Sequence, residues 1–410
     1  MKYIIKRNGS KQPFNSQKII NAIKKAKEET NTSMLDDVIK IIAETIEVKI
    51  NKSKHEFTVE EIQDLVVKAL MVKNKDLAIA YQRYRTNREN ERNLKMQYEI
   101  AGLINADKDI VNENANKDSK TISVKRDLLA GIASRNYYLN NVLPKHIKQA
   151  YDDGYLYLHD LDYLLFKETN CELIHLERML KGGCKIGNAK MAEPKSIEVA
   201  VAHTIQIISS VSSNTFGGCT VPYIDKTLIP YLRKTYIKHL NHGLKYIEET
   251  SEYEINNDLY FAEDYKWKNI YKHCKEEHLK AHNFAIHMTE ESVKQAMQAL
   301  EYEINSLSTI NGQSPFTTIG FGTETSWEGK LIQEYILRTR LEGFGVKKEV
   351  VVFPKLVYTV CEGLNFNPED PNYDILKLAM KCMANSIYPD IIFPTKEQVD
   401  NGTVVYPMGE

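Results

Sequence analysis

Helical and strand patterns alternate along this chain from residue 125 onward, and that alternation constrains the fold more than any other feature. Apolar residues follow one helical face at 196–213, whereas 310–322 reads as a strand between turn residues. The segment 350–360 is strongly β-prone, and Pro354 within it predicts a strand edge or a break. Strands that alternate with helices are typical of parallel β/α units. The sequence therefore predicts an α/β fold built on a parallel sheet.

Further elements are expected around this sheet, with a turn at Gly154. The charged and aromatic stretch 254–294 is expected to be a surface insertion with helical pieces. The other expected elements are, in chain order, helices at 126–143 and 146–153, strands at 155–159 and 163–166, and helices at 223–240 and 292–307.

Composition restricts the classes of function. The 54 lysines and arginines balance 55 acidic residues, and 42% of the chain is hydrophobic, which is typical of a soluble globular protein of two or three domains. This balance gives no argument for direct nucleic-acid or membrane-surface binding. The start MKYIIKRNG lacks a signal-peptide core, and the most apolar stretch, 199–211, is interrupted by polar residues. No membrane association is expected.

Cysteine usage favours a reducing cytoplasm. The six cysteines are widely spaced and none forms a CxxC pair, so we predict no metal-ligating residues in this chain. They are Cys171, Cys184, Cys219, Cys274, Cys361 and Cys382.

The first ninety residues predict a β-turn unit on a bundle of helices. Residues 3–5 are β-prone, and Asn8-Gly9 supplies the positive φ of a turn cheaply. Thr58 and Glu61 have the spacing of a capping box. Helices are expected at about 16–26, 35–48 and 59–69 and from Leu77, and the inward residues of the second are expected to be Val38, Ile41, Ile42 and Ile46.

Three cations lie near one turn and one helix N-terminus in this region: Lys6, Arg7 and Lys18. Backbone N–H groups and the helix dipole there suit a phosphate chain. Taken singly, each cation is more often a solvated surface charge. Only as a set do they indicate a nucleotide site.

Together these residues resemble the ATP-cone, the regulatory nucleotide-binding module of ribonucleotide reductases. The matching text over residues 3 to about 92 is IIKRNGSKQPFNSQKIINAI, FTVEEIQDLV and AIAYQRYR, in that order. The resemblance implies binding of ATP and dATP, and the absence of a P-loop argues against ATP hydrolysis. The positions that match its nucleotide contacts are Lys6, Arg7, Asn15, Lys18 and Thr58.

The tract HDLDYLLFKETNCELIHLERMLKGGC, residues 159–184, concentrates acidic residues, histidines and cysteines. Cys171 follows a polar break and is expected at the end of a strand or in the turn after it, where a sulfur can face a cavity. The alternative is a small buried core thiol, which is the common state of a free cysteine. Residue chemistry alone favours the core thiol.

The larger part of the chain resembles the catalytic subunit of the anaerobic, class III ribonucleoside-triphosphate reductases, which are oxygen-sensitive glycyl-radical enzymes. With the cone, the resemblance covers nearly all of the chain. The matching segments are ENANKDSK (113–120), RDLLAG (126–131), HDLDY (159–163), TNC (169–171), IGNA (186–189), PKSI (194–197), LEYEIN (300–305), NGQSPF (311–316), FPKLV (353–357), DPNYDI (370–375) and YPDI (388–391).

The resemblance implies a ten-stranded α/β barrel made of two five-stranded parallel halves. Cys171 falls at the strand cysteine beside the family's thiyl radical, so its implied role is in radical reduction of the ribose. Cys184 and Cys219 match no catalytic position and are expected in the core. The positions that match the family's deoxynucleotide effector contacts at a dimer interface are Asp160, Lys195, Gln206 and Lys238.

The resemblance also implies cofactors and partners. These are a ribonucleoside triphosphate substrate, ATP or dATP and dNTP effectors with Mg²⁺, a radical-SAM activating enzyme, formate as reductant, and a homodimer. The glycyl radical and a structural zinc belong to the family's C-terminal part.

The end of the chain departs from the family. The family's loop motif is Pro-Met-Gly-Cys, and its cysteine bears the thiyl radical, whereas this chain reads Pro407-Met408-Gly409-Glu410. We therefore expect a truncated N-terminal portion that is inactive alone, with a second chain as one source of the rest.

The domains expected in this portion are a cone at 1–94, a linker at 95–124 and part of the barrel at 125–410. The alternative is an inactive remnant that keeps only the nucleotide-binding cone. A formate-lyase relative is disfavoured, because the cone points to nucleotide reduction.

Overall fold

The computed structural model describes residues 2–5, 11–30, 34–104, 121–165, 169–250, 255, 264–310, 312 and 314–407. Its contacts divide the chain into two units. The first holds Met1–Glu113 and Lys125–Phe166, and the second holds Asn114–Val124 and Lys167–Glu410. Among the described residues, no helix combines the length and the apolar content that crossing a membrane requires.

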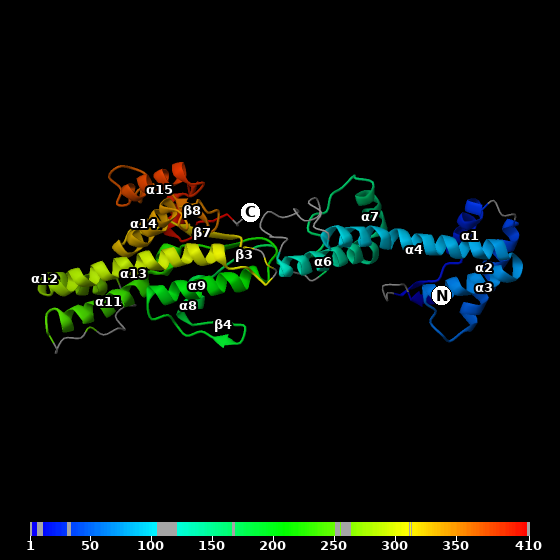
Figure 1. The fold of residues 1–410 in the computed structure, drawn as a ribbon, viewed down its shortest axis with the longest axis horizontal. Helices are drawn as coiled ribbons and strands as arrows, with labels where there is room; N and C mark the ends of the chain where they lie inside the picture. The colour runs from blue at the N-terminus through cyan, green and yellow to red at the C-terminus, as the bar shows by residue number, and fades with distance from the viewer. Residues whose placement is uncertain are drawn as a thin grey trace. The chain divides into compact units, whose positions relative to one another are not determined.

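The first unit begins with a two-stranded antiparallel sheet and continues into helices (Figure 1). The strands are β1 (Tyr3–Ile5) and β2 (Lys11–Pro13). The helices are α1 (Gln17–Thr30), α2 (Asp36–Lys52), α3 (Val59–Lys73) and α4 (Lys75–Ile104). This hairpin and bundle are what the sequence predicts for the first ninety residues.

One face of each helix in this bundle is buried. Ile23 and Ala26 of α1 are fully buried, as predicted. In α2 the buried residues are Ile39, Ile42, Ala43, Ile46 and Ile50. The prediction that Ile41 points inward is wrong, since its side chain is 56% exposed. Steps of three and four residues along the buried set place position 41 on the opposite side of the helix.

The predicted capping box is present at the start of α3. Thr58 Oγ1 accepts a hydrogen bond from Glu61 N at 3.2 Å, and Glu61 Oε2 accepts one from Thr58 N at 2.8 Å. Each residue thus satisfies a backbone donor that the first turn of a helix leaves free.

Helix α4 continues past the predicted end of the first domain. It ends at Ile104, so residues 95–104, predicted as the start of a linker, are helical. Arg135 Nη2 pairs with Glu99 Oε2 of this extension at 3.0 Å. The later helices of the unit are α6 (Ile122–Tyr137), the π-helical η1 (Tyr138–Val142) and α7 (Lys145–Asp152).

The strands predicted after Gly154 are wrong for the described residues. Residues 155–160 are irregular and the next five form turns, while Phe166 lies outside the described residues. Tyr155 and Tyr157 are more than four-fifths exposed, so their alternation does not reflect burial on a sheet. Asp160 has a φ of 55°, which interrupts an extended chain.

A five-stranded parallel sheet organises the second unit, as the alternation of helices and strands predicts. Its order is β3-β6-β7-β8-β9 and its neighbours pair in parallel throughout. Each crossover therefore moves one position in the same direction, as in half of a barrel. The strands are β3 (Glu172–Leu173), β6 (Cys219–Val221), β7 (Thr317–Phe321), β8 (Lys355–Thr359) and β9 (Asp390–Ile392). A separate antiparallel pair joins β4 (Lys185–Ile186) to β5 (Ala189–Lys190).

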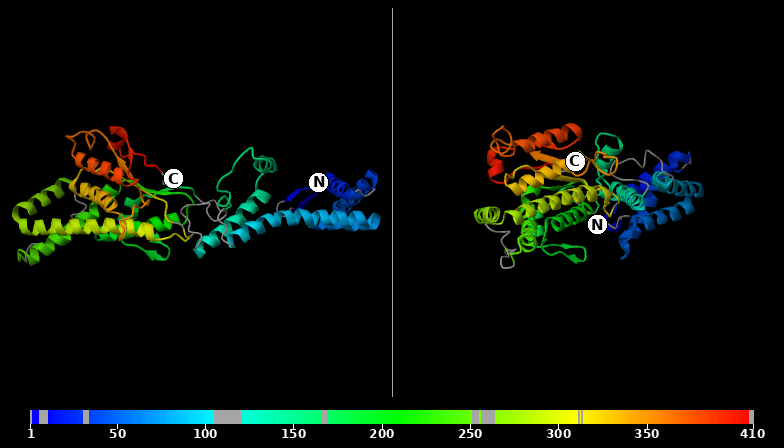
Figure 2. Two further views of the ribbon diagram at one scale, coloured as in Figure 1. Left: turned by 45° about the horizontal axis from the view of Figure 1, so that its top comes forward. Right: turned by 60° about the vertical axis from the view of Figure 1, so that its left-hand side comes forward.

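Helices cover one face of this sheet, and α9, α11 and α13 lie side by side (Figures 1 and 2). Buried residues of α9, α13, α14 and α15 join those of β6, β7 and β8 in one hydrophobic core. The helices of the unit are α8 (Leu176–Lys181), α9 (Ile197–Ser212), α10 (Ile224–Thr227), α11 (Ile229–Tyr246), α12 (Asp264–Glu277), α13 (Leu279–Ser306), α14 (Trp327–Glu342), α15 (Tyr373–Asn385) and α16 (Lys396–Asp400).

The two faces of the sheet carry different side chains, because successive residues of a strand point to opposite sides. The helix-covered face contributes Cys219, Val221, Ile319, Phe321, Leu356 and Tyr358 to the core. The opposite face, called the inner face here, carries Thr220, Thr318, Gly320, Val357 and Thr359. Its three threonines are almost fully buried. The inner face is therefore lined by small and partly polar residues.

Helix α12 and the first turns of α13 correct the expectation of a surface insertion at 254–294. Trp267 and Cys274 of α12 are 1% and 0% exposed and form a second core cluster with Tyr236 of α11. The Trp267 and Tyr236 rings meet edge to face, with centroids 5.8 Å apart. Aromatic side chains of this stretch therefore pack in a core instead of lying at the surface.

Candidate functional site

Cys171 lies directly before β3, at an edge of the parallel sheet. The prediction of a position at or after the end of a strand is therefore wrong, because the strand follows the cysteine. Gly217 N donates to Asn170 O at 2.8 Å, and Glu172 N donates to Gly218 O at 3.1 Å. The ladder between β3 and β6 thus extends back across Cys171.

Cys171 belongs to the inner face of the sheet. Side chains alternate along an extended strand, and Ile174, directly after β3, is buried in the main core. Cys171 and Leu173 therefore share the opposite face. Leu173 is in register with Thr220, which is itself an inner-face residue.

The Cys171 thiol packs against a glycine pair. Gly218 N donates to Sγ at 3.4 Å, and the thiol donates to Asn170 Oδ1 at 3.4 Å. A Cβ added to Gly217 would lie 2.7 Å from Sγ and 2.2 Å from Asn170 Oδ1. These separations are far below van der Waals contact, so Gly217 creates the space that the thiol and the amide occupy.

Residues 404–407, called the strap here, cross the inner face. Tyr406 OH lies 2.9 Å from Thr359 Oγ1 of β8. Thr220 Oγ1 of β6 donates to Pro407 O at 3.1 Å. The strap therefore runs from β8 to β6, which is the neighbour of the strand that begins after Cys171.

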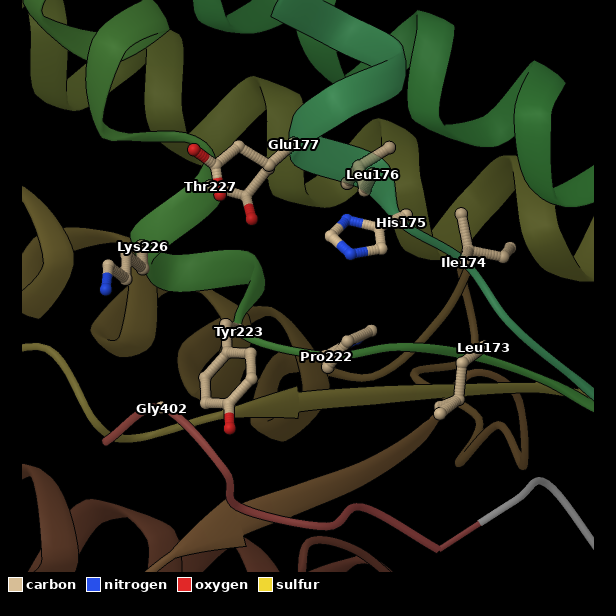
Figure 3. A pocket seen from close by; sticks show the side chains of 10 residues that line it. All are labelled: Leu173, Ile174, His175, Leu176, Glu177, Pro222, Tyr223, Lys226, Thr227 and Gly402. Atoms are coloured by element: carbon tan, nitrogen blue, oxygen red, sulfur yellow. The ribbon is translucent and has the colours of Figure 1, made fainter. Parts of the chain in front are cut away.

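A cavity of about 350 Å³ opens at the C-terminal ends of β3 and β6 (Figure 3). The His175 ring points into it, and Lys226, Thr227 and Glu177 lie around its rim. Leu173, on the same face as Cys171, contributes to its apolar lining. Ligands of open α/β sheets bind at this end of the strands. Cys171 precedes β3 and is not among the residues that line the cavity.

Comparison with known families gives the class of protein. The profile described as "Anaerobic ribonucleoside-triphosphate reductase" matches residues 113–410, and the profile described as "ATP cone domain" matches residues 2–90. The chain belongs to the anaerobic ribonucleoside-triphosphate reductase family. Both resemblances drawn from the sequence are thereby confirmed.

The relatives carry the same name. The anaerobic ribonucleoside-triphosphate reductase of Haemophilus influenzae is 40% identical over 99% of this chain and 54% of that protein. That of Escherichia coli is 39% identical over 99% of this chain and 53% of that protein. That of Enterobacteria phage T4 is 41% identical over 77% of this chain and 48% of that protein. The chain thus spans about half the length of the curated relatives it matches.

A solved structure is also similar to this chain. It is the anaerobic ribonucleotide reductase from Thermotoga maritima with dATP bound in the specificity site, which aligns at 15% identity with a TM-score of 0.45. The alignment covers 75% of this chain and 48% of that chain.

Two of the predicted reductase effector residues lie at the start of α9. Lys195 directly precedes Ser196, the N-cap of that helix. Lys238 lies on α11 near Glu198 in the first turn of α9. Burial opposes ionisation of Glu198, but hydrogen bonds from Ser196 and Ser292 and the charge of Lys238 together hold the pKa of Glu198 below its usual value.

The other two effector residues are placed differently. Gln206 lies eight residues after Glu198, which is about 12 Å along the helix axis. Asp160 belongs to the first unit, where its carboxylate contacts His159. The structure therefore brings Lys195 and Lys238 to one end of α9 and places Gln206 farther along it.

The described cone candidates lie at helix starts. Asn15 Oδ1 accepts a hydrogen bond from Gln17 N at 2.8 Å, and Lys18 is exposed in the first turn of α1. Lys6 and Arg7 lie outside the described residues.

The hairpin separates two of the cone candidates. Thr58 bridges to Ile5, at the end of β1 that leads into the turn. Asn15 follows Pro13, which pairs with Tyr3 at the opposite end of the hairpin. Asn15 and Thr58 therefore do not lie at one end of it.

Cys184 and Cys219 lie in or against the core, as expected from the sequence. Cys219 is fully buried with its Sγ 3.2 Å from Ser212 Oγ, and burial raises the pKa of its thiol. Burial also raises the pKa of Cys184, which packs partly buried against the main core. Within the described part of the chain, no cluster of three His, Cys, Asp or Glu side chains could hold a metal ion.

Two features of the site were not anticipated from the sequence, namely the Gly217 contact and the strap. The Gly-Gly pair before Cys219 could have indicated the first feature, and the glycine inside the apolar strand TTIGF could have indicated the second. A glycine within a strand marks the close approach of another group.

Proposed function

We propose that this chain forms the ATP-cone and the first half of the catalytic barrel of an anaerobic ribonucleoside-triphosphate reductase. Such an enzyme reduces ribonucleoside triphosphates to deoxyribonucleoside triphosphates for DNA synthesis. The observation that carries the proposal is the place of Cys171 on the inner face of a five-stranded parallel sheet, next to a strap that crosses that face. Family membership supplies the class of reaction.

Cys171 is proposed to return hydrogen to the substrate. When a thiyl radical has taken a hydrogen atom from the ribose, an adjacent S–H can donate one back. The half-buried thiol is held between Asn170 and Gly218, and this fixed position supports the proposed role. Formate is proposed as the reductant. The family's glycyl radical and zinc are proposed to lie outside the described residues, among which no three His, Cys, Asp or Glu side chains are grouped to hold a metal ion.

Two nucleotide sites are proposed to regulate this reaction. In the cone, Lys6, Arg7, Asn15, Lys18 and Thr58 are proposed to contact ATP or dATP with Mg²⁺. At the start of α9, Lys195 and Lys238 are two cations that suit effector phosphates. Gln206 is proposed to read a base edge, and Asp160 to contact ribose or base.

The proposed partners follow from the family. They are a radical-SAM activating enzyme, a second copy of the chain in a homodimer, and the remaining half of the barrel, within the same protein or on a second chain. The proposed compartment is the cytoplasm, where the six free cysteines stay reduced.

Anaerobic turnover by the reductase that contains this chain tests the role of Cys171. With activating enzyme and formate present, Cys171→Ser is expected to abolish deoxynucleotide formation. The matched control, Cys184→Ser, is expected to retain most of it, since that thiol only packs against the core. Full turnover by Cys171→Ser would refute the catalytic role.

Calorimetric titration with dATP tests the cone. Lys18→Ala is expected to weaken binding at least tenfold, because a charged contact contributes about 1.5–3 kcal/mol. Lys40→Ala removes an exposed lysine from α2 and serves as the control, with unchanged affinity expected. Equal affinities for the two variants would count against the proposed phosphate contact.

A further inference from the structure

Gly320 occupies the middle of the inner face, where any other residue would place a side chain. It lies in the central strand β7, in register with Val357 of β8. Glycine weakens a strand interior, because it packs nothing and has more backbone freedom to lose. A glycine at the centre of a buried sheet therefore indicates that another group approaches the backbone closely.

That group is the ring of Tyr406. A Cβ added to Gly320 would lie 2.3 Å from Tyr406 Cδ1 and 2.4 Å from Cε1. The ring is only 3% exposed, and its edge meets Tyr223 with the centroids 5.2 Å apart. The phenol group reaches Thr359 Oγ1 at 2.9 Å, so the polar end of the buried ring is satisfied.

The contacts of Val404 and Pro407, on either side of Tyr406, show in which direction the strap crosses the strands. Val404 packs on Val357 of β8, and its carbonyl accepts a hydrogen bond from Tyr223 OH at 3.0 Å. The Pro407 carbonyl is bound by Thr220 of β6 at 3.1 Å. From Val404 to Pro407 the strap thus passes from β8 over β7 to β6.

One further step in this direction is the edge strand β3. Thr220 is in register with Leu173, and Cys171 lies two residues before Leu173 on the same face. We propose that Gly320 and Tyr406 form a seat that fixes the strap on the inner face, with Pro407 on the strand next to the one that follows Cys171, and thereby limits access to that thiol. In this role Tyr406 and Gly320 are positioning residues.

The proposal adds to the proposed reductase function, because it names the residues that set the approach to the reactive thiol. The seat itself is independent of turnover. Its test therefore uses the full chain without substrate, so that failure of the seat and failure of the catalytic role of Cys171 give different results.

The test compares Gly320→Ala and Tyr406→Ala with Val405→Ala. Val405 is the neighbour of Tyr406, but its side chain is 77% exposed, so its truncation controls for changes in the strap that leave the seat intact. Two quantities are measured by mass spectrometry: the hydrogen-exchange rate of the strap peptide and the rate at which iodoacetamide alkylates Cys171. Cys184, also half-buried, serves as the reference thiol in the same molecule.

Both seat variants are expected to raise strap exchange at least tenfold and Cys171 alkylation at least threefold, with Cys184 unchanged. Val405→Ala is expected to behave as the unmodified chain. Unchanged strap exchange in both seat variants, or Cys171 alkylation that rises only in step with Cys184, would overturn the proposal.

Tyr406→Phe provides a second test should the two larger changes prevent folding. It keeps the ring on Gly320 and removes only the hydrogen bond to Thr359, so a two- to fivefold rise in strap exchange is expected. Exchange equal to that of the unmodified chain would contradict the seat. A reductase that keeps turnover with Cys171→Ser while the seat variants loosen the strap would refute the catalytic role alone.

Discussion

Arg233 Nε lies 2.7 Å from Glu328 Oε1, in an ion pair that joins α11 to α14 with both side chains almost fully buried. The Arg233 guanidinium also lies over the Trp267 ring, 4.9 Å from its centroid. Removing one partner of a buried pair leaves the other charge desolvated and uncompensated, which typically costs about 3–5 kcal/mol. We therefore expect Glu328→Ala to lower the free energy of unfolding by that amount.

Urea unfolding followed by tryptophan fluorescence measures this loss, because Trp267 and Trp327 both belong to the second unit. Glu334→Ala on the same helix is the control. It breaks an exposed pair with Arg338, and such pairs contribute at most about 1 kcal/mol. Similar losses for the two variants would contradict the importance of the buried pair.

Asp225 predicts a pH dependence of stability. Its carboxyl group is fully buried, and burial raises its pKa to about 6 although Gly322 N and Gln333 Nε2 donate to Oδ2 at 2.9 and 2.8 Å. The nearby charge of Glu324 raises it further. Because the folded state holds the proton more tightly, stability is fully present below about pH 4 and decreases as the pH rises through 6. The expected loss is about 3 kcal/mol.

Comparison with Asp225→Asn isolates this contribution. The amide cannot ionise, so the variant is expected to gain stability relative to the unmodified chain as the pH rises from 4 to 7. Urea unfolding at several pH values gives the difference. Two parallel stability curves would show that Asp225 has the same pKa in both states.

Substitutions at Thr58 can distinguish its role as the N-cap of α3 from a contact with the nucleotide. Thr58→Ala removes the oxygen that accepts from Glu61 N, and loss of such a cap costs about 1 kcal/mol. Hydrogen exchange in the first turn of α3 is expected to speed up accordingly, whereas Thr58→Ser keeps the cap and is expected to match the unmodified chain. If Thr58 also contacts dATP, the alanine variant binds dATP more weakly and the serine variant does not. Thr45→Ala, on an exposed face of α2, is the control.

The order of helices and strands was accessible from the sequence because burial imposes a period on it. The buried faces of α1 and α9 follow from the spacing of apolar residues, and β7 lies within the stretch 310–322 that reads as a strand between turn residues. Tyr155 and Tyr157 show the limit of this inference. Their alternation has the period of a strand, but both rings are exposed and no strand in the described part of the chain pairs with them.

The candidate site was accessible only in part. The family resemblance singled out Cys171, although residue chemistry alone favoured a core thiol. Its face of the sheet was not accessible, because that depends on where β3 begins. Its contacts are less accessible still, since Gly217 lies 46 residues and the strap more than 230 residues farther along the chain. The spacing of neighbouring residues does not indicate which group from a distant part of the chain packs against a glycine.

Gly217→Ala tests whether the space left by the missing side chain at Gly217 is needed to position the Cys171 thiol. The added methyl group would meet Asn170 Oδ1 and Cys171 Sγ, so both side chains have to move. Overpacking of this kind typically costs about 1–3 kcal/mol. If Cys171 reduces the ribose as proposed, turnover by the reductase that contains this chain is expected to fall at least tenfold, because the thiol is displaced.

Gly182→Ala is the matched control for Gly217→Ala. The nearest atom to its added Cβ is Arg178 O at 3.6 Å, an ordinary contact, and its φ of −94° suits alanine. This variant is expected to keep both turnover and the iodoacetamide reactivity of Cys171. In Gly217→Ala the alkylation rate of Cys171 is expected to fall, because the methyl group covers one side of the sulfur. Equal alkylation rates and equal turnover in the two variants would mean that the glycine pair does not hold the thiol in place.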